Sequence, residues 1–166
     1  MENDSDLAAF NNWRAEQPDA KRSGLVFAAN DHAAKSCSVW WAGPETDFLH
    51  RMRAEARARS ITLLVNRAPY SRQEIRQAFA LIWGAQERLG RLGFGLQAVK
   101  GPSRVFFGLT VVGFALEDEE AEQLPQALVA SVRGELADLL QDSQMRLDDV
   151  RIEYGRVYPA TAAPYA

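Results

Sequence analysis

The chain has 166 residues and a formal net charge of −3, with 47% hydrophobic and 25% charged residues. These values are ordinary for a globular protein, so they exclude a largely disordered chain and allow one domain or two small ones. No apolar run is long enough to cross a bilayer, the acidic N-terminus is unlike a secretory signal, and Cys37 is the only cysteine. We therefore expect a cytoplasmic protein with no internal disulfide and no membrane partner.

Hydrophobic periodicity and turn residues define the elements expected in the first half of the chain. They are a helix over 5–16, a hairpin of strands over 24–29 and 36–42, a helix opened by Gly43 and Pro44, and a strand over 61–65. Pro44 is expected at the first helical position, and the run 61–65 is typical of a central strand. Trp40 and Trp41 should point to opposite faces of the sheet, so one belongs in the core. The other needs cover from a helix, the tail or a partner.

The second half repeats the same order after a longer helix. The expected elements are a helix over 71–89, strands over 96–99 and 104–112, a helix whose first turn is marked by Pro125, and a strand over 150–154. Ser71 and Glu74 form a capping-box pattern at the start of the first of these helices. The sequence thus predicts a helix, ββαβ, a connecting helix, and ββαβ again.

This order indicates an internal duplication in an α/β (α+β) protein, with helices packed on antiparallel or mixed sheet. The expected divisions are an N-terminal helix and linker over 1–23, a first ββαβ unit over 24–66, a connecting helix over 67–95, a second ββαβ unit over 96–155 and a C-terminal tail over 156–166. The connecting helix is expected to pack between the two units. A single sheet with helices on one face is the alternative arrangement.

Part of the chain resembles a known family of prodomains. The stretch from Val65 to Ile75, the run Leu92-Gly93-Phe94-Gly95 and the segment from Arg104 to Leu109 are similar to prodomains of alpha-lytic-type, actinobacterial chymotrypsin-like serine proteases. The detailed similarity covers about 45 residues. In that family the region is a folding chaperone and inhibitor of the attached protease, and its C-terminal strand and tail bind at the protease active site. The resemblance implies non-catalytic protein binding and supplies no catalytic residues.

Residues that could carry catalysis or bind a metal are few. His32 and His50 are the only histidines, and with Cys37 they lack the spacing of metal ligands. Cys37 with His32 is one candidate for a thiol nucleophile, but a strand cysteine between serines is more often a small buried hydrophobe. The glycines of residues 90–95 follow a helix instead of opening one, so they do not fit a phosphate-binding loop. We expect no enzyme activity, metal or cofactor.

The leading hypothesis is a non-catalytic protein-interaction module. Its partner is another protein, peptidase-like by the resemblance, or a second copy of the chain, engaged through a sheet edge or the C-terminal tail. The candidate partner-binding residues are Trp40, Trp41, Tyr158, Tyr165 and Ala166.

The first alternative is a binder of nucleic acid or of an anionic ligand. Residues 50–104 carry 11 basic and 3 acidic side chains, and the candidate binding residues are Arg51, Arg53, Arg57, Arg72 and Arg76. A sequence pI of about 5.5 and the absence of an RNP-like motif count against nucleic acid. The second alternative is a small enzyme whose site the sequence does not reveal.

Overall fold

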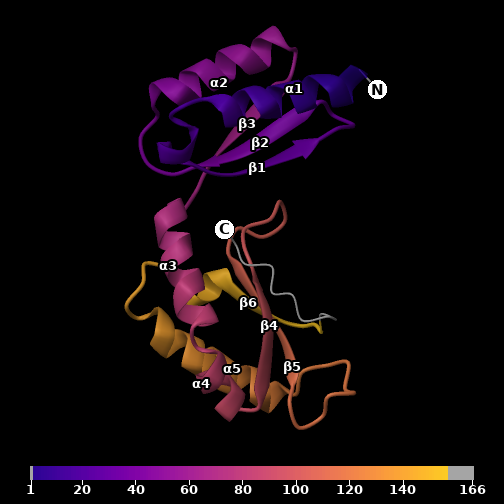
Figure 1. The fold of residues 1–166 in the computed structure, drawn as a ribbon, viewed down its shortest axis with the longest axis vertical. Helices are drawn as coiled ribbons and strands as arrows, with labels where there is room; N and C mark the ends of the chain where they lie inside the picture. Colours follow the sequence, from indigo (N-terminus) through magenta and orange to yellow (C-terminus); the bar gives the residue numbers. More distant parts are fainter. Residues whose placement is uncertain (1, 157–166) are drawn as a thin grey trace. The chain divides into compact units, whose positions relative to one another are not determined.

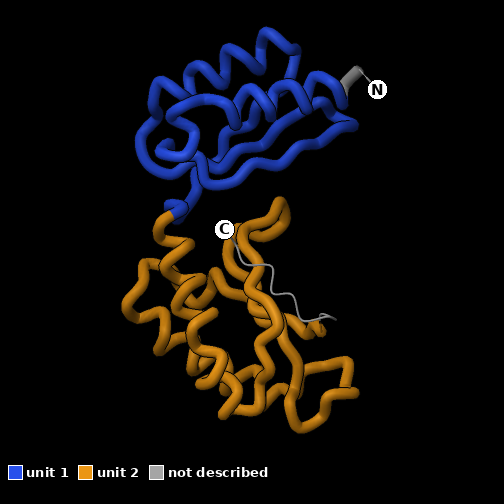
Figure 2. The backbone as a smooth tube through the Cα atoms, viewed as in Figure 1, with its two compact units in different colours: residues 1–72 blue, residues 73–166 orange. Residues whose placement is uncertain are grey.

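The protein has two mixed three-stranded sheets together with helices. This confirms the α+β fold class expected from the sequence. The computed structural model describes residues 2–156, with side chains from Asp4 onward. The chain divides into two compact units, residues 1–72 and residues 73–166 (Figure 2). Because each unit has its own sheet, the alternative of one continuous sheet is wrong. Within residues 2–156, no helix combines the length and apolar character that a membrane span needs.

Unit 1 consists of a β-hairpin, a third strand that runs parallel to the second hairpin strand, and the helices that cover this sheet. Its elements are α1 (Glu2–Glu16), the short 3-10 helix η1 (Ala20–Arg22), β1 (Leu25–Asp31), β2 (Ser36–Trp41), α2 (Asp47–Ala58) and β3 (Thr62–Arg67). Strand β2 is central, with β1 antiparallel on one side and β3 parallel on the other. Helix α2 makes the crossover between the two parallel strands, as a parallel pair requires (Figure 1). Strand β3 therefore lies at an edge of the sheet.

The core of unit 1 lies between one face of this sheet and the helices α1 and α2 (Figure 1). It contains Leu7, Phe10, Cys37, Val39, Trp41, Phe48, Leu49, Met52, Ala56 and Ile61, all buried. The two adjacent tryptophans do face opposite ways. Trp41 is only 3% exposed and its ring lies 6.2 Å from that of Phe48, whereas Trp40 is half-buried, with its ring 5.2 Å from that of Phe27.

Unit 2 has the same strand order and directions. Its elements are α3 (Arg72–Trp83), which begins at the unit boundary, α4 (Gln86–Arg91), β4 (Phe94–Lys100), β5 (Leu109–Ala115), α5 (Gln126–Leu140), the short 3-10 helix η2 (Leu147–Asp149) and β6 (Val150–Tyr154). Strand β5 is central and buried along its whole length, antiparallel to β4 and parallel to β6. The order hairpin, helix and parallel strand thus occurs in both units, which is loosely consistent with the predicted duplication. The helical region expected to connect the units is grouped, from Gln73 onward, with unit 2.

Three predicted elements differ in the structure. The strand predicted over 104–112 begins only at Leu109, because the Ser103 amide donates to the Phe106 carbonyl and closes a turn before it. The helix predicted to open at Pro44 begins at Asp47, with Thr46 as its N-cap, since Gly43 at φ +81° turns the chain first. The helix predicted over 71–89 is broken after Trp83, where Gly84, a poor helix former, is followed by a tightened turn from the Ala85 amide to the Ile82 carbonyl.

Candidate functional site

Among the described residues, no strand pairs with the outer side of β3, so this strand presents a free, exposed edge. Five of its six residues are exposed, and they include the apolar side chains of Leu64 (50% exposed) and Val65 (36% exposed). The sequence indicated a central strand here, and that prediction is wrong, since β3 pairs with β2 alone. The apolar run resembles a buried strand because Leu63 and Val65 share the face of the sheet that Val39 presents to the core.

The hydrogen bonds between β2 and β3 determine which β3 amides point toward β2 and which point away from it. At the two ends of the strand, the Thr62 amide donates to the Lys35 carbonyl and the Ala68 amide donates to the Trp41 carbonyl. In a parallel pair the residues that bond to the neighbour alternate along the strand. Even-numbered residues of β3 therefore bond to β2, and the amides and carbonyls of Leu63, Val65 and Arg67 point outward at the free edge.

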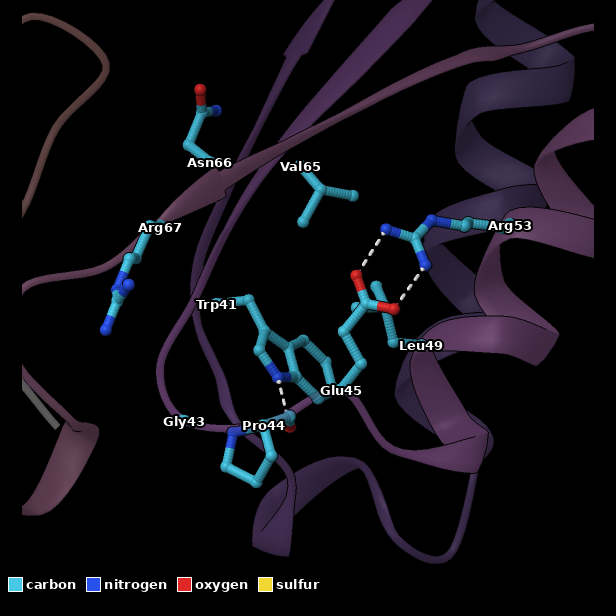
Figure 3. A pocket seen from close by; sticks show the side chains of 9 residues that line it. All are labelled: Trp41, Gly43, Pro44, Glu45, Leu49, Arg53, Val65, Asn66 and Arg67. Atoms are coloured by element: carbon cyan, nitrogen blue, oxygen red, sulfur yellow. Dashed lines mark hydrogen bonds and ion pairs between the residues drawn. The ribbon is translucent and has the colours of Figure 1, made fainter.

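A pocket of about 650 Å³ lies beside this edge (Figure 3). Trp41, Leu49 and Val65 form its apolar part, contributed by β2, α2 and β3 respectively. The indole Nε1 of Trp41 donates to the Pro44 carbonyl over 3.0 Å, which fixes the ring against the loop after β2. The remaining lining residues are Gly43, Pro44, Glu45, Arg53, Asn66 and Arg67. The pocket thus lies at the carboxyl ends of two parallel strands, where ligand sites of α/β sheets recur.

Gly24 lets the Trp41 ring take this place. The Ala42 amide donates to the Gly24 carbonyl over 2.7 Å, which brings the start of β1 against the end of β2. A Cβ at position 24 would collide with the Ala42 carbonyl and with the Trp41 indole. A glycine is therefore required beside the tryptophan that lines the pocket.

Three charged side chains of the described residues line the pocket, and two of them, Glu45 and Arg53, form an ion pair. Arg53 donates to both carboxylate oxygens of Glu45 over 2.9 and 2.7 Å, and this pairing holds the pKa of Glu45 below its usual value. For Arg67, no ion pair of the guanidinium is found among the described residues. In the view of Figure 3 it lies on the other side of Trp41 from the Arg53–Glu45 pair. The pocket is therefore suited to an apolar group flanked by an anionic one.

The predicted partner-binding residues lie in different places and do not form one site. Trp41 lines the pocket, whereas Trp40 lies on the opposite face of the sheet beside Phe27. Tyr158, Tyr165 and Ala166 lie outside the described residues. Sequence reasoning did not identify Leu49 or Val65 as site residues, and it considered Arg67 only with the other arginines of the anion-binding alternative. For Val65 and Arg67 the one sequence signal is that the apolar run ends in the polar pair Asn66-Arg67, as a strand does where it leaves the core.

The five arginines proposed as an anion-binding face lie in different environments. The Arg51 guanidinium donates to Gln17, Asp19 and Asp47, and its hydrogen bond to the Asp19 carboxylate raises the pKa of Arg51. Arg53 is paired with Glu45. Arg57 is exposed on α2, Arg72 is the first residue of α3, and Arg76 lies in unit 2. Two of the five charges are therefore neutralised by neighbouring carboxylates.

The residues considered for thiol or metal chemistry are not assembled into a site. Cys37 is buried, and burial raises the pKa of its thiol despite the Arg14 guanidinium 3.5 Å from the sulfur. The His32 Nδ1 lies 2.6 Å from an Asp4 carboxylate oxygen at the exposed start of α1. Within the described part of the chain, no three His, Cys, Asp or Glu side chains are grouped so as to hold a metal ion.

Comparisons of the chain with protein-family models, with curated proteins and with solved structures found no significant match. The geometry of the β3 edge and its pocket is therefore the basis for a functional proposal.

Proposed function

We propose that the protein is a non-catalytic interaction module that binds an extended segment of another protein along the free edge of β3. The observation that carries this proposal is the row of outward-facing backbone groups at Leu63, Val65 and Arg67, with a pocket directly beside it. Such an edge is a template for pairing with a further strand. Binding by strand addition obtains affinity from main-chain hydrogen bonds and specificity from pockets for alternate side chains.

The face on which Val65 lies determines which partner side chains are recognised. Val65 and Arg67 are two residues apart, so both belong to the face of the sheet that carries Trp41 and the pocket. A partner residue opposite Val65 places its side chain over Trp41 and Leu49, and one opposite Arg67 meets a guanidinium. The preferred segment therefore carries an apolar residue and an acidic residue two positions apart. Which of them comes first depends on whether the added strand runs parallel or antiparallel to β3.

The resemblance to alpha-lytic-type prodomains adds a peptidase-like protein as the first class of partner to test. A second copy of the chain is the other source of a pairing strand, and the concentration dependence of the molecular mass distinguishes the two. The binding surface is the same for a peptidase-like protein and for a second copy of the chain, because each would add an extended strand to β3.

The test is a binding titration of the full chain with synthetic extended peptides. Peptides with an apolar and an acidic residue two positions apart should bind more tightly than the same residues placed adjacently. Methylation of the peptide backbone nitrogens that face β3 should abolish binding. Arg67→Gln should weaken binding about threefold to tenfold, the range of a partly exposed charged contact. Arg57→Gln, an exposed arginine of α2, is the matched control and should have no effect.

Two results of this titration would contradict the proposal. One is equal affinity for the two spacings, because the peptide would then not be in strand register with β3. The other is unchanged affinity after backbone methylation, because main-chain pairing would then contribute nothing.

A further inference from the structure

A second pocket of unit 1 has a different lining from the one beside β3. It has a volume of about 320 Å³ and is lined by Arg22, Ser23, Gly24, Ala42, Pro44, Thr46, Ser71 and Arg72. Two arginines and three hydroxyl-bearing residues thus line one small hollow, and no carboxylate is found among the described residues that line it. Arginine is the residue most suited to bidentate recognition of oxyanions.

Neither arginine of this pocket is neutralised within the described part of the chain. No ion pair of Arg22 or Arg72 is found there. The Nε–H of Arg72 is buried and has no acceptor among the described residues. Buried donors are almost always hydrogen-bonded, because leaving one without a partner is unfavourable. An acceptor from outside the chain satisfies it once a movement of the Arg72 side chain exposes the Nε–H, which solvent does not reach in this structure.

Three carboxylates near the pocket in the sequence, Asp19, Glu45 and Asp47, pair with other arginines. Asp19 precedes η1, which carries Arg22, and one of its oxygens accepts from Arg51 over 2.6 Å, while the other, Oδ1, is buried without a partner among the described residues. Asp47 follows Thr46 and also accepts from Arg51, and Glu45 is held by Arg53. None of these pairs involves Arg22 or Arg72.

Thr46 adds a donor at the same place. It is the N-cap of α2, yet its side chain makes no capping hydrogen bond to that helix. The first amides of a helix have no partner inside the helix, and the helix dipole favours an anion at this end. The wall of the pocket at Thr46 therefore offers a hydroxyl group beside an uncapped helix start.

We propose that this pocket binds a phosphate group, either as inorganic phosphate or as a small phosphate monoester. Two guanidinium groups without an ion pair among the described residues match the charge of a dianion, and the planar fork of each suits bidentate recognition of phosphate oxygens. The site is independent of strand addition at β3, since the lining residues other than Pro44 do not line the pocket beside that strand.

The test is an amide NMR titration of the full chain at constant ionic strength, with inorganic phosphate, O-phosphoserine and acetate as separate probes. Phosphate should give saturable shifts at Ser23, Thr46 and Ser71, and acetate should not. If the monoester is the ligand type, O-phosphoserine binds more tightly than inorganic phosphate; the reverse order assigns the site to the free ion. Arg22→Gln and Arg72→Gln should each weaken binding about tenfold or more.

The controls keep the proposal falsifiable. Arg22 is exposed, so Arg22→Gln should preserve the dispersed amide spectrum even if Arg72→Gln unfolds the chain. Arg57→Gln tests for loss of a distant positive charge and should leave the affinity unchanged. The proposal is overturned if shifts fail to saturate at about 10 mM phosphate, if acetate produces the same shifts, or if Arg57→Gln weakens binding as much as Arg22→Gln.

Discussion

Replacing Val65 by proline should abolish binding of the partner segment and leave the fold of unit 1 intact. The Val65 amide points outward at the free edge, so proline there removes a donor to the partner but no hydrogen bond to β2. Proline is tolerated at such positions of edge strands. Its ring also occupies the space that an added strand would take. Titration with the tightest-binding peptide measures the loss, and circular dichroism checks that the fold is retained.

Two further proline substitutions make this result specific. Leu64→Pro, one residue away, removes an amide that the alternation directs at β2, so it should destabilise unit 1 by about 1–3 kcal/mol. Ile152→Pro places proline at an outward position of β6, the corresponding edge strand of unit 2, and should leave binding unchanged. The outward direction of Ile152 follows from the bond of the Gly155 amide to the Gly113 carbonyl. Retained binding by Val65→Pro, or equal loss with Ile152→Pro, would show that the β3 edge is not the site.

Replacing Phe48 by alanine should lower the free energy of unfolding by about 3–5 kcal/mol, the usual cost of removing a buried aromatic ring. Phe48 is 1% exposed, and its ring lies 6.4 Å from the ring of Trp13 and 6.2 Å from that of Trp41. It therefore joins α1, β2 and α2 in one cluster. Urea unfolding followed by tryptophan fluorescence reports mainly on unit 1, because Trp13, Trp40 and Trp41 lie there and only Trp83 lies in unit 2.

Val105→Ala is the matched control for this stability measurement. Val105 is 85% exposed in the turn before β5, so its truncation should change the free energy of unfolding by less than about 0.5 kcal/mol. A cost below about 1 kcal/mol for Phe48→Ala would contradict the core described for unit 1.

Local patterns predicted many of the elements correctly. The strand over 150–154, the second strand of the first hairpin and the start of α5 after Pro125 all agree with the structure within a residue or two. Each depends on periodicity or on the fixed backbone of proline, which act over a few residues. The strand predicted over 104–112 was wrong at its start. The apolar residues before Leu109 continue the pattern of the strand although they lie in the turn that precedes it. Bonds between Ser103 and Phe106 decided in favour of the turn.

The candidate site was less predictable than the elements that form it. Trp41 was identified because adjacent tryptophans on a strand must face opposite ways. Val65 and Arg67 were not placed in a partner-binding site, because that role depends on β3 pairing with β2 on one side only. Sheet order results from contacts between segments far apart in the sequence, and one sequence carries no local sign of it. The second pocket depends in the same way on bringing Arg22, Thr46 and Arg72 together from three different elements.

Residue-resolved amide hydrogen exchange tests the central claim most directly, because it reports on each amide of β3 in the free and the bound protein. In the free protein, the amides of Leu63, Val65 and Arg67 should exchange faster than those of Leu64 and Asn66, which bond to β2. On addition of a binding peptide, the three outward amides should become protected and the other two should change little. Slow exchange of the outward amides in the free protein, or no protection of them when peptide is bound, would contradict strand addition at β3.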